Sequence, residues 1–298
     1  MYYIGVDAGG TKTYTAIVDQ KQKIIFEYKN GPGNIAVAYD EAKTNILAGI
    51  KTALSSAYGP ACKGIVIGVA GAGKGSRKQV LQSFLSQHVQ LPVLVISDAE
   101  LAYYSIFQNE SGILAIAGTG SIFLTKMNGQ FRTFGGWGHL LGDEGSAYDI
   151  GIQALKIIAN ELDAKGISST FAKVLAEKYN IQNSNLLKEF VYSSDKAAIA
   201  EVSFTVYELA KKGENQAREL LTSAGIRLAE QALRFLKILQ TTDPVHIACK
   251  GSLLEKNEIV FQAFKEKLLE RETVLSISKQ TPETVTGAKA AWLSEKEG

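Results

Sequence analysis

The sequence predicts an α/β protein built from two domains. The first observation is chain length, because 298 residues are enough for two domains that each bury a full core. The second is that short apolar runs typical of buried strands alternate with amphipathic stretches typical of helices. The third is an architectural repeat, since a strand, a Gly/Thr turn and another strand occur at residues 6–18 and again at 113–127.

Composition narrows the function classes. The chain is 46% hydrophobic and 21% charged, with a net charge of +2, so no electrostatic argument favours nucleic acid or a membrane surface as a partner. No apolar stretch reaches bilayer length, and the first residues lack the pattern of a signal peptide. Cys62 and Cys249 are far apart in sequence and predict neither a disulfide framework nor a metal cluster, which favours a reducing cytoplasm.

The first element is a strand that ends at Asp7 and leads into a turn. Gly9 and Gly10 allow the backbone of this turn to approach an anion closely. Thr11 and Lys12 add donors to the row of N–H groups, and such a row binds anions. A carboxylate in the position of Asp7 can hold a hydrated Mg²⁺ against phosphates. The turn therefore predicts a phosphate site, although an ordinary Gly-Gly hairpin would have the same pattern.

Neither common nucleotide motif fits this turn, because residues 13–18 predict a second strand and both motifs lead into a helix. The segment GVAGAGK at 68–74 nearly matches a P-loop, but Gly75 occupies the position of the Ser or Thr that binds Mg²⁺. A P-loop at this second segment stays as the weaker alternative.

Residues 24–97 alternate predicted strands and helices. Strands are expected at 24–28, 64–70 and 92–97, and helices at 39–57 and 77–87. Asn34 ends a turn before the first helix and by itself is explained as a turn or cap residue. Asp98 follows the last strand at its carboxyl end, where open α/β sheets bind ligands. A helix is expected to start at Ala99 or Glu100, so Asp98 also fits the N-cap of that helix.

The second strand–turn–strand unit follows directly. Strands are expected at 112–117 and 122–127, joined by Gly118, Thr119 and Gly120. Asn128 and Gly129 then predict a type I′ hairpin turn. Two such turns in two domains would face each other across a cleft and clamp one phosphate chain.

A glycine-rich segment, GGWGHLLGDEGSAYDIG, occupies residues 135–151. Its composition argues against a core element. Trp137, next to Gly136, is expected to expose its ring as an apolar face on a cleft wall. Asp143 and Glu144 precede a helix expected to begin near Ser146, so their simplest explanation is compensation of the helix dipole.

The remainder is mainly helical until residue 240, with a break at AKKG, which begins at Ala210. A buried strand at 245–250 leads through Gly251 and Ser252 into a helix, which suits contact with a nucleoside but also a plain turn. A helix of small residues from 286 should pack closely against a neighbour. Two domains are expected at 1–109 and 110–285, with the helix at 286–298 able to join the first.

Taken in order, these motifs resemble the sugar kinase, actin and heat-shock-chaperone ATPase superfamily. Within it, the chain is similar to the N-acetylglucosamine kinase branch of the BadF/BadG/BcrA/BcrD-type ATPase family. The resemblance covers essentially the whole chain, and its most specific part is the block GGWGHLLGDEGSAY. It implies two actin-like (ribonuclease H-like) domains around a central cleft.

The resemblance also implies roles for residues that match the family's motifs. ATP phosphates would contact Gly9, Gly10, Thr11 and Lys12 in one turn and Gly118, Thr119 and Gly120 in the other. Mg²⁺ would be held through water by Asp7. Adenosine would lie near Ala210, Gly251 and Ser252. The sugar would contact Asn34, Ala70, Gly71, Asp98, Gly136, Trp137 and Asp143. Ala70 occupies a position where related enzymes carry a Ser that reaches the sugar, so this contact is lost.

The implied activity is phosphorylation of the 6-hydroxyl of N-acetylglucosamine by ATP, with Asp98 as the base. N-acetylmuramic acid and glucosamine remain alternative substrates, and a homodimer remains open. Zinc-binding glucokinase-like relatives and iron–sulfur dehydratase activators need clustered cysteines, which Cys62 and Cys249 do not provide. A non-sugar ATPase or nucleotide switch is the remaining alternative, but it would not need Asp98 or Trp137.

Overall fold

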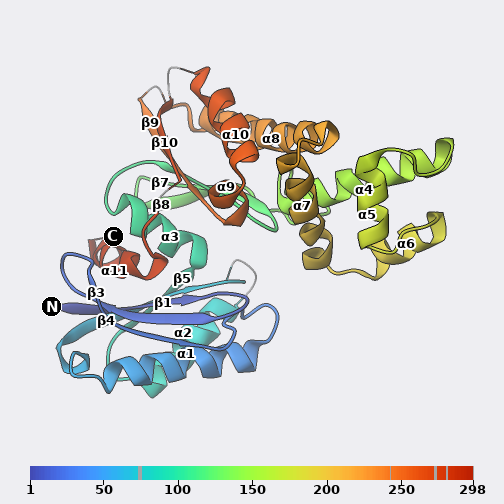
Figure 1. The fold of residues 1–298 in the computed structure, drawn as a ribbon. Coiled ribbons are helices and arrows are strands. Elements are labelled where there is room, and N and C mark those ends of the chain that lie inside the picture. Colours follow the sequence, from blue (N-terminus) through green and yellow to red (C-terminus); the bar gives the residue numbers. More distant parts are fainter. Residues whose placement is uncertain (73–75, 242, 272–273, 280, 298) are drawn as a thin grey trace. The chain divides into compact units, whose positions relative to one another are not determined.

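The computed structural model describes residues 1–72, 76–241, 243–271, 274–279 and 281–297. It confirms the predicted α/β class (Figure 1). The chain forms two compact units. The first consists of Met1–Gly112, Leu124–Phe131 and Thr281–Gly298, and the second of Ile113–Phe123 and Arg132–Gln280.

The first unit is organised around a five-stranded sheet with the order β3-β2-β1-β4-β5. Its strands are β1 (Tyr2–Ala8), β2 (Thr13–Val18), β3 (Ile24–Asn30), β4 (Cys62–Val69) and β5 (Val93–Ser97). The first three strands pair antiparallel as a meander, whereas β4 pairs parallel to β1 and β5 parallel to β4. The three parallel strands therefore end at the same edge of the sheet.

Helices cover both faces of this sheet. Figure 1 shows α1 (Tyr39–Leu54) and α2 (Arg77–His88) on one face, and α3 (Asp98–Phe107) with α11 (Ala288–Glu297) on the other. The alternation of side chains along β4 explains both layers. Ile65 and Ile67 pack in the core with α1 and α2, whereas Val66 packs with Leu101 and Trp292 of the other layer.

The end of the chain packs closely on β1, as the small residues predicted. A Cβ atom added to Gly5 would lie 2.3 Å from the carbonyl oxygen of Val285 and 3.1 Å from Cβ of Ala288. Val285 belongs to the short 3₁₀ helix η2 (Thr284–Gly287) that precedes α11. A second 3₁₀ helix, η1 (Gly59–Ala61), precedes β4. Only glycine at the centre of β1 lets this backbone approach the sheet.

The second sheet has the order β10-β9-β6-β7-β8. Its strands are β6 (Ile113–Ala117), β7 (Ser121–Met127), β8 (Gln130–Gly135), β9 (Val245–Lys250) and β10 (Val274–Ser278). When the second sheet is read from β8 and strands are counted within each sheet, both orders are third, second, first, fourth and fifth. The predicted repeat therefore extends to topology. Asn128 and Gly129 have φ values of 49° and 78°, which agree with the predicted type I′ turn.

The second unit carries most of the helices. They are α4 (Ala147–Ala164), α5 (Thr170–Lys178), α6 (Ser184–Ser193), α7 (Lys196–Lys211), α8 (Asn215–Leu239), α9 (Ser252–Lys256) and α10 (Glu258–Leu269). Their inner faces form one large apolar core that includes Phe171, Leu228 and Phe264. The predicted break at AKKG is confirmed, because α7 ends at Lys211 and Gly213 has a φ of 89°.

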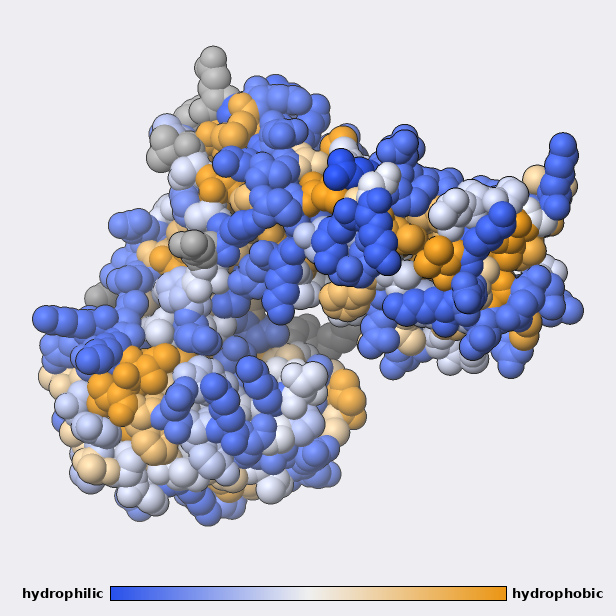
Figure 2. Space-filling model, viewed as in Figure 1, coloured by the Kyte–Doolittle hydropathy of each residue, from blue (hydrophilic) through white to orange (hydrophobic). Residues whose placement is uncertain are grey.

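The face of α7, α8 and α10 seen in Figure 2 is mostly hydrophilic, with smaller apolar areas between the polar side chains. Within the described ranges, no helix combines the length and the apolar character needed to cross a bilayer.

Gly5→Ala tests the close packing of the chain end. The added methyl group would overlap the Val285 carbonyl, so we expect the free energy of unfolding to fall by about 1–3 kcal/mol, measured by denaturant unfolding. Gly10→Ala is the matched control, because a Cβ atom there has no neighbour within 4 Å. Equal stability of the two variants would contradict this packing argument.

Candidate functional site

In the first unit, strand register aligns three of the predicted site positions. Asp7 pairs with Gly68 of β4, which pairs with Ile96 of β5. Asp7, Ala70 and Asp98 therefore emerge at the same carboxyl edge. Neighbouring strands lie about 4.8 Å apart, so β1 and β5 are about 10 Å apart. The two carboxylates share an edge, but this separation leaves room for a small molecule.

The turn after β1 is held by backbone hydrogen bonds at Gly9 and is exposed to solvent at its tip. Gly9 N–H donates to the Lys12 carbonyl at 3.0 Å, and the Gly9 carbonyl accepts from Gly33 N–H at 2.8 Å. Gly10, Thr11 and Lys12 are exposed. A fixed turn with exposed N–H groups and an exposed cation is a suitable anion site.

Asn34 lies beside Gly71. The side-chain oxygen Oδ1 of Asn34 accepts from Ala36 N–H at 2.9 Å, and a Cβ atom on Gly71 would be 2.8 Å from it. The backbone N–H of Ile35 donates to the Ala70 carbonyl at 3.2 Å. The helix α1 has no side-chain cap, so Asn34 is a turn residue and not a cap.

The P-loop-like segment is described only in part, because Gly73, Lys74 and Gly75 lie outside the described residues. After it, Arg77 at the start of α2 donates from Nη1 to the carbonyl oxygen of Ile35 at 2.9 Å. This contact links α2 to the loop that carries Asn34.

Asp98 is the first residue of α3, so the predicted helix start at Ala99 or Glu100 was wrong. The N-cap is Ser97, whose Oγ accepts from Glu100 N–H at 3.1 Å. Glu100 Oε2 accepts in return from Ser97 N–H at 2.7 Å, which completes a capping box. The cap role that the sequence allowed for Asp98 therefore belongs to Ser97.

The Asp98 carboxylate accepts a hydrogen bond from Ala99 N–H at Oδ1, at 2.9 Å. Asp98 is exposed by its solvent-accessible surface, although the protein atoms around its carboxyl group still raise the pKa of that group by desolvation. Hydrogen bonding to the backbone of Ala99 and Asp98 opposes this rise in pKa, and the charge of Glu100 adds to it. A carboxylate with a raised pKa accepts a proton more readily than an ordinary Asp.

In the second unit, the turn after β6 is bonded to the start of α4. Gly118 N–H donates to the Gly120 carbonyl at 2.9 Å. The carbonyl oxygens of Gly118 and Thr119 accept from the N–H groups of Ala147 at 2.9 Å and Tyr148 at 3.4 Å. Because these carbonyls face the helix and Gly118 N–H bonds within the turn, Thr119 and Gly120 supply the N–H groups that could bind an anion.

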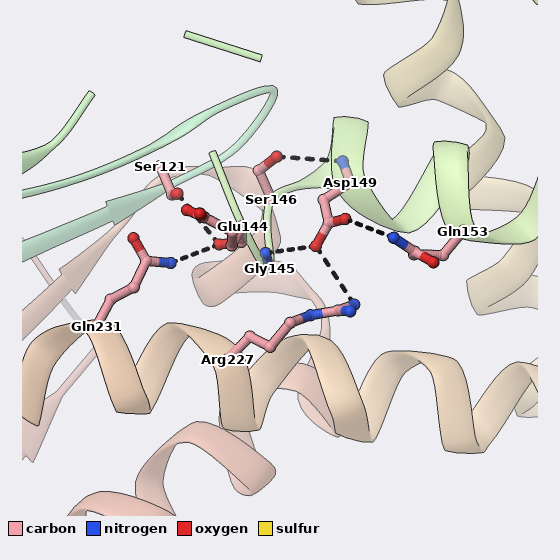
Figure 3. Close-up of polar contacts among 8 residues, drawn as sticks. All are labelled: Ser121, Glu144, Gly145, Ser146, Asp149, Gln153, Arg227 and Gln231. Carbon is pink, nitrogen blue, oxygen red and sulfur yellow. Dashed lines mark hydrogen bonds and ion pairs between the residues drawn. The ribbon is translucent and has the colours of Figure 1, made fainter. Parts of the chain in front are cut away.

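The end of the glycine-rich segment is held by a polar network (Figure 3). Gly145 N–H donates to Asp149 Oδ2 at 2.7 Å, and Arg227 Nη2 lies 3.3 Å from the same oxygen. The carbonyl oxygen of Glu144 accepts from Gln231 Nε2 at 2.7 Å and from Ser121 Oγ at 3.2 Å. The predicted surface segment is therefore anchored to α4, α8 and β7.

The same segment contains two residues that were predicted to contact the sugar, one of them exposed and the other buried. Trp137 is 74% exposed, as expected for an apolar face, and Leu140 and Leu141 are also exposed. Asp143 is only 3% exposed. Its Oδ1 accepts from Ser121 N–H at 3.0 Å, so helix-dipole compensation is not its main role.

A cavity of about 240 Å³ lies near the start of α9, in the second unit. Its lining residues are Ala147, Ser203, Phe204, Tyr207, Glu208, Ser252, Leu253, Lys256 and Asn257. Ser252 was predicted near adenosine, whereas the aromatic residues of α7 were missed. Their signal in the sequence was the pair Phe204 and Tyr207, spaced to share one helix face. Ala210 is fully buried in the core of this unit, where its carbonyl accepts from Gly213 N–H.

A larger cavity of about 330 Å³ in the first unit involves other residues. It is lined by parts of α2, β5, α3 and α11, including Lys78, Tyr104 and Ser294. None of the predicted site residues belongs to this lining.

Comparison with known proteins finds relatives along nearly the whole chain. This chain is 28% identical over 275 residues to the N-acetylmuramic acid/N-acetylglucosamine kinase of Clostridium acetobutylicum, and the match covers 90% of each protein. It is 26% identical over 313 residues to the N-acetyl-D-glucosamine kinase of Dictyostelium discoideum, covering 99% of this chain and 98% of the relative.

Among solved structures, a candidate N-acetylglucosamine kinase from Chromobacterium violaceum superposes with a TM-score of 0.72 at 22% identity, covering 98% of each chain. This likeness shows the two-domain, actin-like kinase fold that the sequence predicted. Residues 4–291 match the model of the BadF/BadG/BcrA/BcrD ATPase family, and the chain belongs to this family.

Proposed function

We propose that this protein is an ATP-dependent amino-sugar kinase that phosphorylates the 6-hydroxyl of N-acetylglucosamine or a close relative. The observation that carries the proposal is Asp98, a carboxylate with a raised pKa at the end of β5. It shares an edge of the sheet with Asp7 and the turn that follows it. Two relatives with amino-sugar kinase names support the choice of substrate class.

ATP is the phosphoryl donor in this proposal, in agreement with the family's description as ATPases. Its phosphates would contact the turn of Gly9, Gly10, Thr11 and Lys12 and the turn of Gly118, Thr119 and Gly120. Because the N–H groups of Gly9 and Gly118 donate within these turns, the N–H groups of the other residues would bind the phosphates. Its adenosine would occupy the cavity beside Ser252, between Gly251 and the aromatic residues of α7. Phe204 and Tyr207 offer ring faces there, and Ala210 would support the wall from the core.

Mg²⁺ would be held by Asp7 together with phosphate oxygens. Among the described residues, no group of three or more His, Cys, Asp or Glu side chains could hold a metal ion. One carboxylate, that of Asp7, together with phosphate oxygens fits Mg²⁺, which is usually bound through one or two carboxylates, waters and substrate phosphates. When bound, the ion offsets the negative charge of the phosphate chain.

Asp98 would act as the general base. As the sugar oxygen attacks the γ-phosphorus, the bond from that phosphorus to the β–γ bridging oxygen breaks and ADP leaves. The hydroxyl proton passes to the Asp98 carboxylate. Asn34, Ala70 and Gly71 would line the sugar site beside it, because they converge on the same loops. Gly136, Trp137 and Asp143 would contribute from the glycine-rich segment.

A panel of N-acetylglucosamine, glucosamine and N-acetylmuramic acid tests the substrate. The exposed Trp137 ring suits an acetamido methyl group better than an ammonium group, so we expect kcat/KM to favour N-acetylglucosamine over glucosamine by about tenfold or more. NMR of the product should place the phosphate on the 6-hydroxyl. A preference for glucosamine would contradict the role of Trp137, and no phosphorylation of any sugar would favour the nucleotide-switch alternative.

Asp98→Asn tests the proposed base. The variant keeps an oxygen that can accept from Ala99 N–H, but it cannot accept the hydroxyl proton. We expect kcat to fall by about 10²–10⁴-fold while sugar binding changes far less. The fold favours the protonated carboxyl, because the pKa is raised. The ionised group therefore costs stability above the unfolded pKa, and Asp98→Asn should not lower Tm at pH 7.

The pH profile gives the same test a second readout. The base must be ionised, so activity should decline as pH falls through the raised pKa, at a higher pH than for an ordinary Asp. Asp98→Asn should lack this decline. A variant with normal kcat would assign Asp98 a purely structural role.

Asp7→Asn separates the phosphate turn from the P-loop-like segment. Loss of the carboxylate should lower turnover by about tenfold or more, with the sugar KM nearly unchanged. Lys74→Ala is the comparison variant. If Lys74→Ala abolishes activity and Asp7→Asn does not, the P-loop alternative is correct.

A further inference from the structure

The second phosphate turn has a cation that comes from a distant part of the sequence. Residues 118–121 are Gly, Thr, Gly and Ser, so the turn has no basic side chain of its own. A Cβ atom added to Gly120 would lie 2.8 Å from Nζ of Lys196. Lys196 is the first residue of α7 and lies beside the turn.

Asp143 holds this lysine in place. Its Oδ2 is 2.7 Å from Lys196 Nζ, and its Oδ1 accepts from Ser121 N–H at 3.0 Å. The Asp143 side chain is 4% exposed, whereas that of Lys196 is 33% exposed. One carboxylate therefore joins the phosphate turn, the glycine-rich segment and the start of α7.

Lys196 can bind a second anion without leaving Asp143. An ammonium group has three N–H donors, and Asp143 uses one of them. The partly exposed head group adjoins a turn whose backbone N–H groups suit a phosphate. A lysine in this position can therefore contact a phosphate oxygen and Asp143 at the same time.

We propose that Lys196 is the cation of the second phosphate turn and binds the β- or γ-phosphate of ATP there, with Asp143 as its anchor. This inference rests on the proposed use of ATP and does not depend on which sugar is phosphorylated. It also gives Asp143 a second role beside the proposed sugar contact, because its two oxygens hold Ser121 N–H and Lys196 and a carboxylate can accept further hydrogen bonds.

The same helix would then contact both ends of the nucleotide. Ser203, Phe204, Tyr207 and Glu208 of α7 line the cavity next to Ser252, and Lys196 begins that helix. Bound ATP would thus fix the position of α7 through its phosphates at one point and through its nucleoside at another.

Calorimetric titration of the full chain with ATP, AMP and adenosine tests the proposal without a sugar. Lys196→Met should weaken ATP binding by about 10- to 100-fold, as expected for loss of a charged hydrogen bond. Binding of AMP and adenosine should change by less than about twofold, because neither carries a β- or γ-phosphate. Lys196→Arg should restore most of the ATP affinity.

Lys267→Met is the matched control, because Lys267 is also an ion-paired lysine of the second unit, with Glu270 at 2.7 Å. It should leave ATP binding unchanged. Lys196→Met leaves the buried Asp143 without its cation, which can lower stability. The double variant Lys196→Met/Asp143→Asn removes both charges and should bind ATP as weakly as the single variant.

Asp143→Asn by itself provides the sharpest comparison. It can keep the bond from Ser121 N–H but removes the charge that positions Lys196, so ATP affinity should fall by less than in Lys196→Met, because the lysine itself remains. Unchanged ATP binding by Lys196→Met and by the double variant would overturn the proposal. An equal loss of ATP and adenosine binding would also overturn it, because it would assign Lys196 a structural role only.

Discussion

The hydrogen bonds that pair β4 with β1 and β5 are the constraint on which the predicted site of the first unit depends. A shift of one residue in either pairing would turn Ile65 and Ile67 away from α1 and α2 and would move Asp98 relative to Asp7. Core packing and site geometry are therefore fixed by the same register. Side chains on both faces of β4 are packed in cores, and this packing opposes such a shift.

The second unit repeats the strand order but secures its turn differently. In the first unit, the turn is closed by Gly9 and by the neighbouring Gly33. In the second, the carbonyls of Gly118 and Thr119 bind the start of α4, and Ser121 binds Asp143. A common topology thus supports two phosphate-type turns whose rigidity has separate origins.

Much of the fold could be predicted because buried strands such as β2 and β9 are continuous apolar or β-branched runs. The strand β8 was indicated only by the hairpin turn before it, because its polar residues are largely exposed, and β10 was missed because Ser276 and Ser278 interrupt its apolar residues. At the end of β5, Ser97 and Asp98 are both good cap residues, and only the reciprocal bond with Glu100 decides between them. The Asp143–Lys196 pair spans 53 positions, so no local pattern could reveal it.

The network around Asp149 and Gln231 has an evolutionary consequence. It holds the glycine-rich segment at residues 144 and 145, mostly through main-chain atoms of the segment. Side chains earlier in the segment are therefore not needed to anchor it. Trp137, Leu140 and Leu141 protrude into solvent and can be exchanged with little effect on stability. The exposed surface of this segment can therefore change through a few substitutions while the scaffold beneath it stays the same.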